Sequence, residues 1–235
     1  MEQYNMRANF YPAKTPTNGF IGSADLAISD ILRLRGIAVF ENSDGPGHHI
    51  QFPSFGEGQN RVSYVVPHSK EAHGQILDVI EKAIADQEQH FGHVAGKRNP
   101  QLSVSGQPVF EPYADARFSL AVGDICTIYG ITTREVPYER SDGKDGSFVA
   151  VNVPNLPPYE KDGETIYPPI FKGLKSSYEK DGQRHDVDYG QMIRYMVLSE
   201  REKALAKLPL ENQMDAASQK AMPVGPVKDA PTHER

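Results

Sequence analysis

Within residues 20–41, hydrophobic and polar residues alternate in the run "LRLRG", and this alternation predicts a half-buried antiparallel strand. In the run "LRLRG" the two leucines fall on one face, whereas Arg33 and Arg35 fall on the other. A period of two residues is typical of a strand that buries one face and exposes the other. The Ser-Asp pair just before this run marks the turn at which the strand begins.

Further elements surround this strand. A short strand is expected in "QYNMRANFYP", followed by a turn-rich link in "KTPTNG". Residues 37–41 and 48–52 are expected to pair as a hairpin, because the Asp-Gly and Pro-Gly pairs of "NSDGPG" favour chain reversal. A third strand, "RVSYVV", ends at Pro67. From Ser69, the expected N-cap, apolar residues recur every three or four positions, which predicts an amphipathic helix.

The same order of elements recurs later in the chain. The segment "AISDI" aligns with "AVGDI", and Gly36 aligns with Gly130, at a constant offset. We interpret the chain as a tandem repeat, since matched residues and matched element order occur together. The predicted parts are a first unit at 1–95, a second unit at 96–209 with a long loop insert at 154–187, and a mobile tail at 210–235.

Residues 2–90 resemble the SpoVG family (stage V sporulation protein G, septation regulator), and residues 100–205 resemble a diverged second copy. The resemblance rests on "DILRLRGIAVFEN", "HIQFPSF" and "YVVPHSKEAHGQILDVIEKA" in the first copy. In the second copy it rests on "DICTIYGITTREV", "GSFVAVNVP", "IYPPI" and "GQMIRYMVL". It implies an α+β fold of two tandem bent antiparallel β-sheet units, each with a C-terminal helix. Because the family forms homodimers joined through strands, it also implies an intramolecular pseudo-dimer, and a further homodimer stays open.

The resemblance further implies a regulator that binds nucleic acid at the start of the helix. Ser69, Lys70 and Gln75 occupy the matching positions in the first copy. The sequence departs from the family at Glu71, an acid where the family is basic. The second helix, which is expected to start at Asp188, has no cation there at all.

The net charge of the 235-residue chain is −6, which does not favour binding to polyanions. Any nucleic-acid contact therefore requires a local basic patch. Arg33 and Arg35 share one strand face, and Arg61 joins them if strand pairing brings it near. The same row of arginines is also what the solvated face of a sheet contains.

A second cationic candidate lies in the insert. There Lys172, Lys175 and Arg184 are interleaved with Phe171 and Tyr178, a composition suited to backbone contact and base stacking. The alternative is an exposed lysine-rich loop without a ligand.

Catalytic and metal-binding motifs do not emerge from the sequence. The single cysteine, Cys126, lies in an apolar strand and is expected in the core. A chain with only one cysteine cannot form an internal disulfide, which fits a reducing compartment such as the cytoplasm. There is no Gly-x-Ser-x-Gly, P-loop or GxGxxG motif, and the histidines lack the spacing of a zinc site, so we predict no cofactor and no metal. The start of the chain has no signal-peptide pattern, and no apolar run approaches the ~20 residues of a membrane span.

The leading hypothesis is a cytoplasmic, non-enzymatic regulator that binds DNA or RNA through local cationic surface. The competing hypothesis is a protein-interaction module or inhibitor that binds a protein partner, of the kind that a mobile element encodes. The acidic net charge favours this hypothesis. An enzyme that uses Cys126 is a third, weaker hypothesis, and a buried thiol would remove it.

Overall fold

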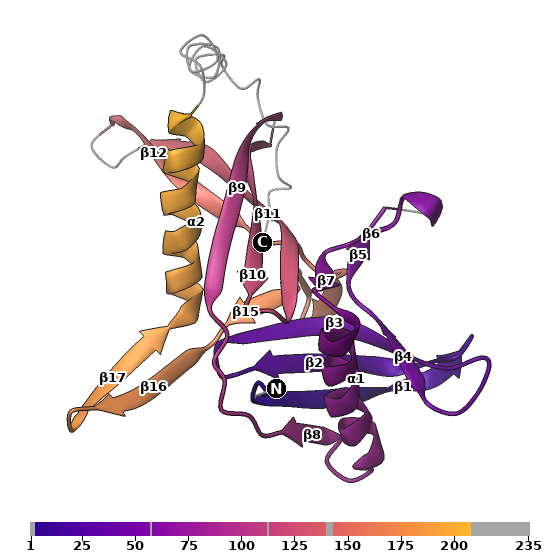
Figure 1. The fold of residues 1–235 in the computed structure, drawn as a ribbon. Coiled ribbons are helices and arrows are strands. Elements are labelled where there is room, and N and C mark those ends of the chain that lie inside the picture. Colours follow the sequence, from indigo (N-terminus) through magenta and orange to yellow (C-terminus); the bar gives the residue numbers. More distant parts are fainter. Residues whose placement is uncertain (1–2, 57, 112, 140–142, 208–235) are drawn as a thin grey trace.

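The computed structural model describes residues 3–56, 58–111, 113–139 and 143–207, and the predicted tail at 210–235 lies outside them. This part of the chain is mostly antiparallel β-structure, arranged as two curled sheets with one helix each. In Figure 1 the first sheet lies across the lower part of the view, and the second rises from it. The predicted α+β class is confirmed at this level.

The first sheet combines N-terminal strands with one strand from the insert. Its members are β1 (Met6–Thr17), β2 (Phe20–Ile28), β3 (Leu32–Glu41), β4 (His48–Gln51), β8 (Phe91–Val94) and β15 (Phe171–Gly173). The strand order is β15-β3-β2-β1-β8, and β4 also pairs with β3, as the predicted hairpin requires.

Strand β1 runs farther than the sequence analysis expects. The link "KTPTNG" is largely strand, because β1 continues to Thr17 and only Asn18 and Gly19 form the turn. Their φ values of 51° and 76° are those of a two-residue hairpin turn, which Asn-Gly adopts at little steric cost. The predicted turn at Ser29 and Asp30 is confirmed, with φ values of 46° and 47°.

Helix α1 (Lys70–Ala85) covers the inner face of the first sheet, and its predicted start is confirmed. The Ser69 hydroxyl oxygen accepts a hydrogen bond from the N–H of Ala72 at 3.0 Å, which satisfies one of the free donors of the first turn. The buried side chains of the helix are Ala72, Ile76, Val79, Ile80 and Ala83, all of them at the predicted apolar positions.

The second sheet has the same plan. Its members are β7 (Val65–Pro67), β9 (Leu102–Glu111), β10 (Ala114–Val122), β11 (Cys126–Glu139) and β12 (Asp145–Asn152). The order is β12-β11-β10-β9, with β7 pairing to the other part of β11. Helix α2 (Tyr189–Ala206) contacts both edge strands, β9 and β12. Its Arg201, only 12% exposed, holds Asp115 of β10 with Nη2 2.6 Å from Oδ2.

Each sheet contains one strand from the other half of the chain. β7 pairs antiparallel with β11, and β15 pairs antiparallel with β3. The register of the two pairings is the same, and so are the backbone hydrogen bonds beside them. In the first sheet Leu34 lies opposite Phe171, and the N–H of Arg35 donates to the carbonyl of Ile170 at 2.8 Å. In the second sheet Ile128 lies opposite Val65 at the equivalent position, and the N–H of Tyr129 donates to the carbonyl of Tyr64 at 2.7 Å.

Both sheets bend at a glycine. Gly36 has a φ of +69° and Gly130 a φ of +84°, and each lies at a β-bulge where two residues oppose one on the neighbouring strand. A bulge increases the local twist of a strand, so the two glycines contribute to the curl of the sheets. The buried residues of both sheets form one continuous hydrophobic cluster inside that curl.

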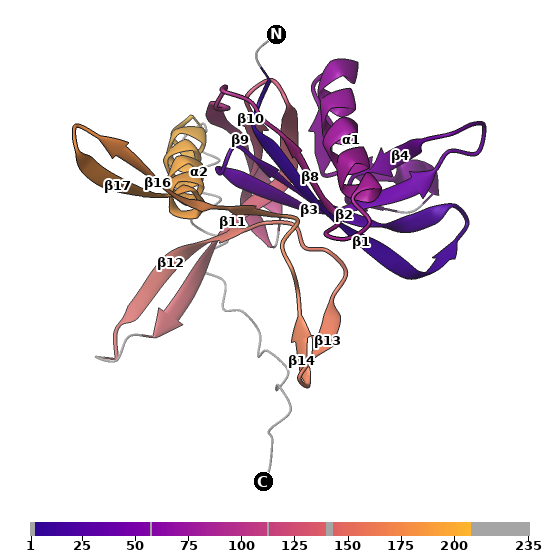
Figure 2. The same cartoon turned by 90° about the horizontal axis from the view of Figure 1, so that it is seen from below.

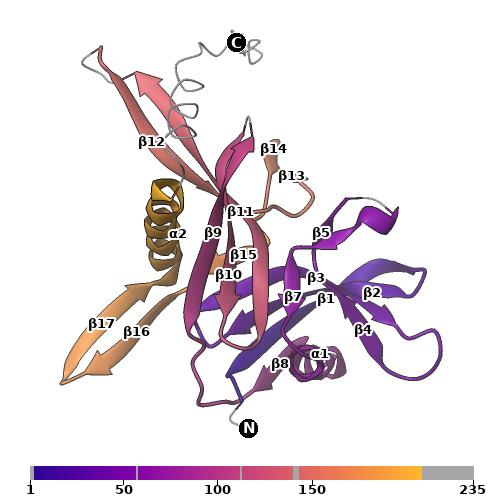
Figure 3. The same cartoon turned by 45° about the horizontal axis from the view of Figure 1, so that its top comes forward.

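The insert at 154–187 is not a loop, and this corrects the expectation. It contains β15 and two hairpins, formed by β13 (Tyr159–Lys161) with β14 (Glu164–Ile166) and by β16 (Lys175–Lys180) with β17 (Gln183–Asp188). The β16–β17 hairpin projects from the body of the molecule in Figures 1 and 3, and the β13–β14 hairpin projects in Figure 2. Hydrophobic and polar residues alternate only weakly in these polar strands, so the sequence pattern does not predict them.

The expected strand "RVSYVV" is also divided. Its first part is β6 (Val62–Ser63), which pairs with β5 (Ser54–Phe55) around a short 3-10 helix (Gly58–Asn60). Its second part is β7, which joins the second sheet. A partner from a distant part of the chain therefore decides where this strand is interrupted.

Candidate nucleic-acid interface

The eight predicted site residues do not gather on one surface. Two come together as direct neighbours across strands, two lie on the projecting hairpin, and the rest lie apart. Their positions are Arg33 and Arg35 on β3, Arg61 before β6, Lys70 and Gln75 on α1, Lys172 on β15, Lys175 on β16 and Arg184 on β17.

Arg33 and Lys172 are the two residues that the fold unites. They are register partners in the β3–β15 pairing, so their side chains leave the same face of the sheet. Both are exposed, and neither forms an ion pair with any residue in the described ranges. Two cations without a carboxylate partner make this spot locally positive, and like charges directly across strands repel each other.

The positive row extends to β1. Ala27 lies opposite Arg33, and Arg7 lies opposite Ala27, so Arg7 continues the line on the same face. Arg7 forms an ion pair with Asp30. The three cations and this one carboxylate give the surface a net charge of 3 − 1 = +2. We call Arg7, Arg33 and Lys172 the cationic row. With neighbouring strands about 4.8 Å apart, three spacings make the row roughly 14 Å long.

Sequence reasoning missed Arg7, although a signal was present. In "MRANF" the first, third and fifth residues are buried, so Arg7 and Asn9 must face outward. What the sequence did not show is that β1 and β3 lie on either side of β2 with these residues in line.

The row at the same register on the second sheet carries no charge. There Thr127 lies opposite Val66 on one side and Ala121 on the other, and Ala121 lies opposite Ser103. The Thr127 hydroxyl also lies 2.7 Å from Nε2 of His68. At this register the cationic row is therefore present on the first sheet and absent from the second.

Arg35 forms an ion pair with Asp25 on the neighbouring strand. Its Nε lies 3.6 Å from Oδ2 of Asp25, whose other carboxylate oxygen accepts a hydrogen bond from the N–H of Gly36 at 3.3 Å. The bulge at Gly36 places Asp25 opposite both residues. Arg35 thus stabilises the bulge and adds no net charge to the cationic row.

The cations of the β16–β17 hairpin are also neutralised. Lys175 lies 3.5 Å from Asp188, and Arg184 lies 3.0 Å from Asp186. Glu179 shares their face by register, so that face holds two cations and three carboxylates. The Gln191 N–H, and then Lys175, lower the pKa of Asp188 below its usual range, so this N-cap stays ionised and holds Lys175. The hairpin is not a basic surface.

Arg61 and Lys70 stand apart from the row. Arg61 donates from Nε to the hydroxyl of Ser54 within the small β5–β6 hairpin. Lys70 is the first residue of α1 and is exposed, with Glu71 beside it. A cation at a helix N-terminus gains nothing from the helix dipole, so Lys70 does not form a site there by itself.

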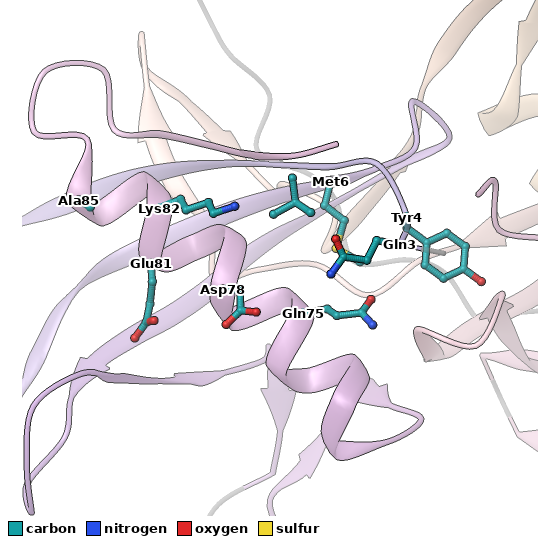
Figure 4. Close-up of a pocket in the computed structure, with 9 residues that line it drawn as sticks. Gln3, Tyr4, Met6, Gln75, Asp78, Glu81, Lys82 and Ala85 are labelled. Carbon is teal, nitrogen blue, oxygen red and sulfur yellow. The ribbon is translucent and has the colours of Figure 1, made fainter. Parts of the chain in front are cut away.

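Gln75 points toward a hollow between α1 and the start of β1. Figure 4 shows it beside Gln3, with Asp78 and Glu81 farther along the same helix. The hollow has a volume of about 410 Å³, and its charged lining is two carboxylates and Lys82. An acidic lining repels phosphate, so this concavity does not extend the cationic row.

Cys126 is fully buried in β11, as expected. Burial raises the pKa of its thiol to about 12, so the reactive thiolate is essentially unpopulated near neutral pH. A Cys126 nucleophile is therefore removed from consideration. Within the described ranges no cluster of three or more His, Cys, Asp or Glu side chains could hold a metal ion. The two described helices are too short or too polar to cross a bilayer.

Comparison with protein-family models, with curated proteins and with solved structures finds no match to this chain.

Proposed function

We propose that this chain is a non-enzymatic, cytoplasmic regulator that binds nucleic acid through the cationic row. The observation that carries the proposal is the placement of Lys172 directly opposite Arg33, with both side chains exposed. Such a like-charge pair lowers stability unless an anion bridges it. A phosphate backbone supplies evenly spaced anions, and binding it releases counterions from the polyanion.

The net charge of −6 limits how this binding can work. Long-range attraction to a polyanion is absent, so affinity must come from contacts at short range. We expect weak binding at physiological salt with a shallow salt dependence, corresponding to two or three phosphate contacts.

The proposal includes the SpoVG-like arrangement, with units at 1–95 and 96–209 forming an intramolecular pseudo-dimer. Support comes from the reciprocal exchange, in which β7 joins the second sheet and β15 joins the first with matching register. Support also comes from the two bulges, at Gly36 and Gly130, which occupy equivalent places in the two sheets. In this arrangement Arg33 belongs to one unit and Lys172 to the other, so the site exists only when the units are paired.

The test compares two double variants of equal charge change. Arg33→Ala/Lys172→Ala removes two unpaired cations, whereas Lys175→Ala/Arg184→Ala removes two that are already neutralised by carboxylates. We expect the first variant to weaken binding to a labelled oligonucleotide and to reduce the salt slope by about 1.4 for a single strand or about 1.8 for a duplex. The second should behave like the unaltered chain. Equal effects of both variants, or no binding by the unaltered chain at low salt, would reject the proposal.

A protein partner is the second candidate, and the acidic hollow beside Gln75 favours it. Asp78 and Glu81 line that hollow, so a basic peptide fits its charge where nucleic acid does not. Asp78→Asn/Glu81→Gln should abolish capture of such a partner and leave the salt dependence of oligonucleotide binding unchanged.

A further inference from the structure

A second exposed surface lies on the outer face of the β11–β12 ribbon. Val136 lies opposite Phe148, and Tyr138 lies opposite Gly146, so these side chains share one face with Arg134 two residues earlier. Tyr138 is 48% exposed and Phe148 is 49% exposed. The distal end of this ribbon projects from the molecule in Figures 2 and 3.

The two rings are held in place by the ribbon itself. A Cβ atom at Gly146 would lie 2.8 Å from Cζ of Tyr138, so the tyrosine ring lies across the glycine backbone. The ring centroids of Tyr138 and Phe148 are 6.1 Å apart with an interplanar angle of 52°. The rings are tilted and not stacked, and about half of each side chain is exposed, so both present aromatic surface to a ligand.

An arginine and a third ring extend this surface. The guanidinium carbon of Arg134 lies 5.7 Å from the ring centroid of Tyr113, which is 76% exposed. Arg134 has no carboxylate within ion-pair distance in the part of the chain that the structure describes. We call Tyr113, Arg134, Val136, Tyr138 and Phe148 the aromatic platform.

The opposite face of the same ribbon is used for folding. Its Glu135 accepts a hydrogen bond from Ser147 at 2.7 Å and lies 3.9 Å from Arg201 of α2. The inward face is thus polar and occupied, whereas the outward face exposes large aromatic groups. Apolar groups gathered on a projecting surface mark a binding site more often than isolated exposed residues do.

We infer that the aromatic platform stacks the unpaired bases of single-stranded nucleic acid, an inference that rests on the proposed nucleic-acid binding. Open aromatic faces accept any base, and an unpaired arginine beside them can contact a phosphate or stack on a base. No member of the platform is acidic. A duplex hides its base faces, so the platform selects single strands and the cationic row does not.

Fluorescence provides the test, because the chain contains no tryptophan. Tyr138→Trp places a single reporter in the platform of the full chain, and Tyr159→Trp places one on the β13–β14 hairpin as the matched control, at 49% exposure. Titration uses a 20-nucleotide mixed-sequence DNA strand, the same sequence as RNA, and the corresponding duplex. We expect the single strands to quench the reporter at position 138, and neither strand to quench the reporter at position 159.

Affinities come from anisotropy of the labelled strands. Tyr138→Ala/Phe148→Ala should weaken single-strand binding roughly tenfold or more without changing the salt slope, since stacking releases no counterions. The matched control, Tyr159→Ala/Tyr167→Ala, removes two exposed rings elsewhere and should have no effect. Circular dichroism melts of each variant establish that the fold is intact.

The outcomes separate this inference from the function on which it rests. Salt-sensitive binding by the unaltered chain, without quenching at position 138 and without loss in Tyr138→Ala/Phe148→Ala, would overturn the inference and leave nucleic-acid binding standing. The platform would then be assigned to a protein partner. Absence of any binding at low salt would overturn both.

Discussion

The hydroxyl of Tyr4 donates a hydrogen bond to the carboxylate of Asp124, which joins the start of the first region to the β10–β11 turn of the second. Arg98 holds the same carboxylate, with Nη1 2.6 Å from Oδ2, and its guanidinium carbon lies 4.8 Å from the Tyr4 ring centroid. These three residues lie at the junction of the two sheets. They connect segments that are far apart in the sequence.

Tyr4→Phe should destabilise the protein while preserving its fold. The ring of Tyr4 is almost fully buried, so the phenylalanine keeps the packing. It loses the hydrogen bond to the carboxylate, together with a long contact of 3.5 Å that the hydroxyl accepts from the N–H of Asp124. Loss of one such bond costs about 1 kcal/mol, which corresponds to a fall in Tm of roughly 2–4 °C. Thermal melts measure this, with Tyr11→Phe as the control because Tyr11 is half exposed. A melt identical to that of Tyr11→Phe would contradict the role given to this bond.

The same pair predicts a pH dependence. The hydrogen bond from Tyr4, together with Arg98, lowers the pKa of Asp124 below its usual 3.8. A depressed pKa contributes stability that is present above about pH 4 and is lost as the pH falls through the folded-state value. Burial, and then the bond to Asp124, raise the pKa of Tyr4 above 10.0. The stability that the protonated Tyr4 hydroxyl contributes is therefore lost as the pH rises beyond 10. Between those two limits the contribution of the Tyr4–Asp124 pair to stability should be greatest.

The difference in Tm between the unaltered protein and Tyr4→Phe should therefore shrink from pH 6 to pH 3. Removing Tyr4 returns the pKa of Asp124 toward its usual value, which leaves less stability to lose in acid. A difference that stays constant over this range would show that Asp124 titrates independently of Tyr4.

Gly36→Ala should be much more destabilising than Gly45→Ala. Gly36 has a φ of +69°, and an added Cβ would lie 2.5 Å from Cδ2 of Leu156. The left-handed backbone alone costs about 1–2 kcal/mol for a residue with a Cβ, and the contact with Leu156 adds to it. Gly45 has open space around it and no such backbone constraint, so it is the matched control. Chemical denaturation at neutral pH compares the two, and equal midpoints would reject the requirement for glycine at the bulge.

Lys172→Glu should stabilise the protein and weaken its binding to oligonucleotides. The substitution replaces a repulsive cross-strand pair with Arg33 by an attractive one, a gain of about 0.2–1 kcal/mol. Lys175→Glu has the opposite effect on stability, because Lys175 already pairs with Asp188. Parallel melts and binding titrations test both, and a lower Tm for Lys172→Glu would contradict the repulsion assigned to this position.

Cys126 should resist alkylation in the folded protein. Its thiol is buried with a pKa of about 12, so iodoacetamide at pH 8 meets almost no thiolate. Full labelling of the single thiol is expected after unfolding in guanidinium chloride. Labelling of the native protein at the rate of a free thiol would show that β11 opens readily.

Features that depend on neighbours in the chain could be predicted from the sequence. The alternation in "LRLRG", the turn at Ser29 and Asp30, and the helix capped by Ser69 are set by backbone geometry and by side chains a few residues away. The recurrence of these features also indicated two similar regions. Arg7 could have been added by the same reasoning, since it alternates with buried residues of β1.

The site itself depended on which distant strands pair. Arg33 meets Lys172 only because β15 joins the first sheet in one register, and a shift of one residue would turn Lys172 to the other face. Arg35 and Lys175 differ from that pair in having a carboxylate of a neighbouring strand within reach, which their own sequence context does not reveal. Arg184 pairs instead with Asp186, two residues along its own strand. The sequence by itself determined the local elements and the inventory of cations. Tertiary structure alone decided which cations stay unpaired, because electrostatic neutralisation depends on distances across strands.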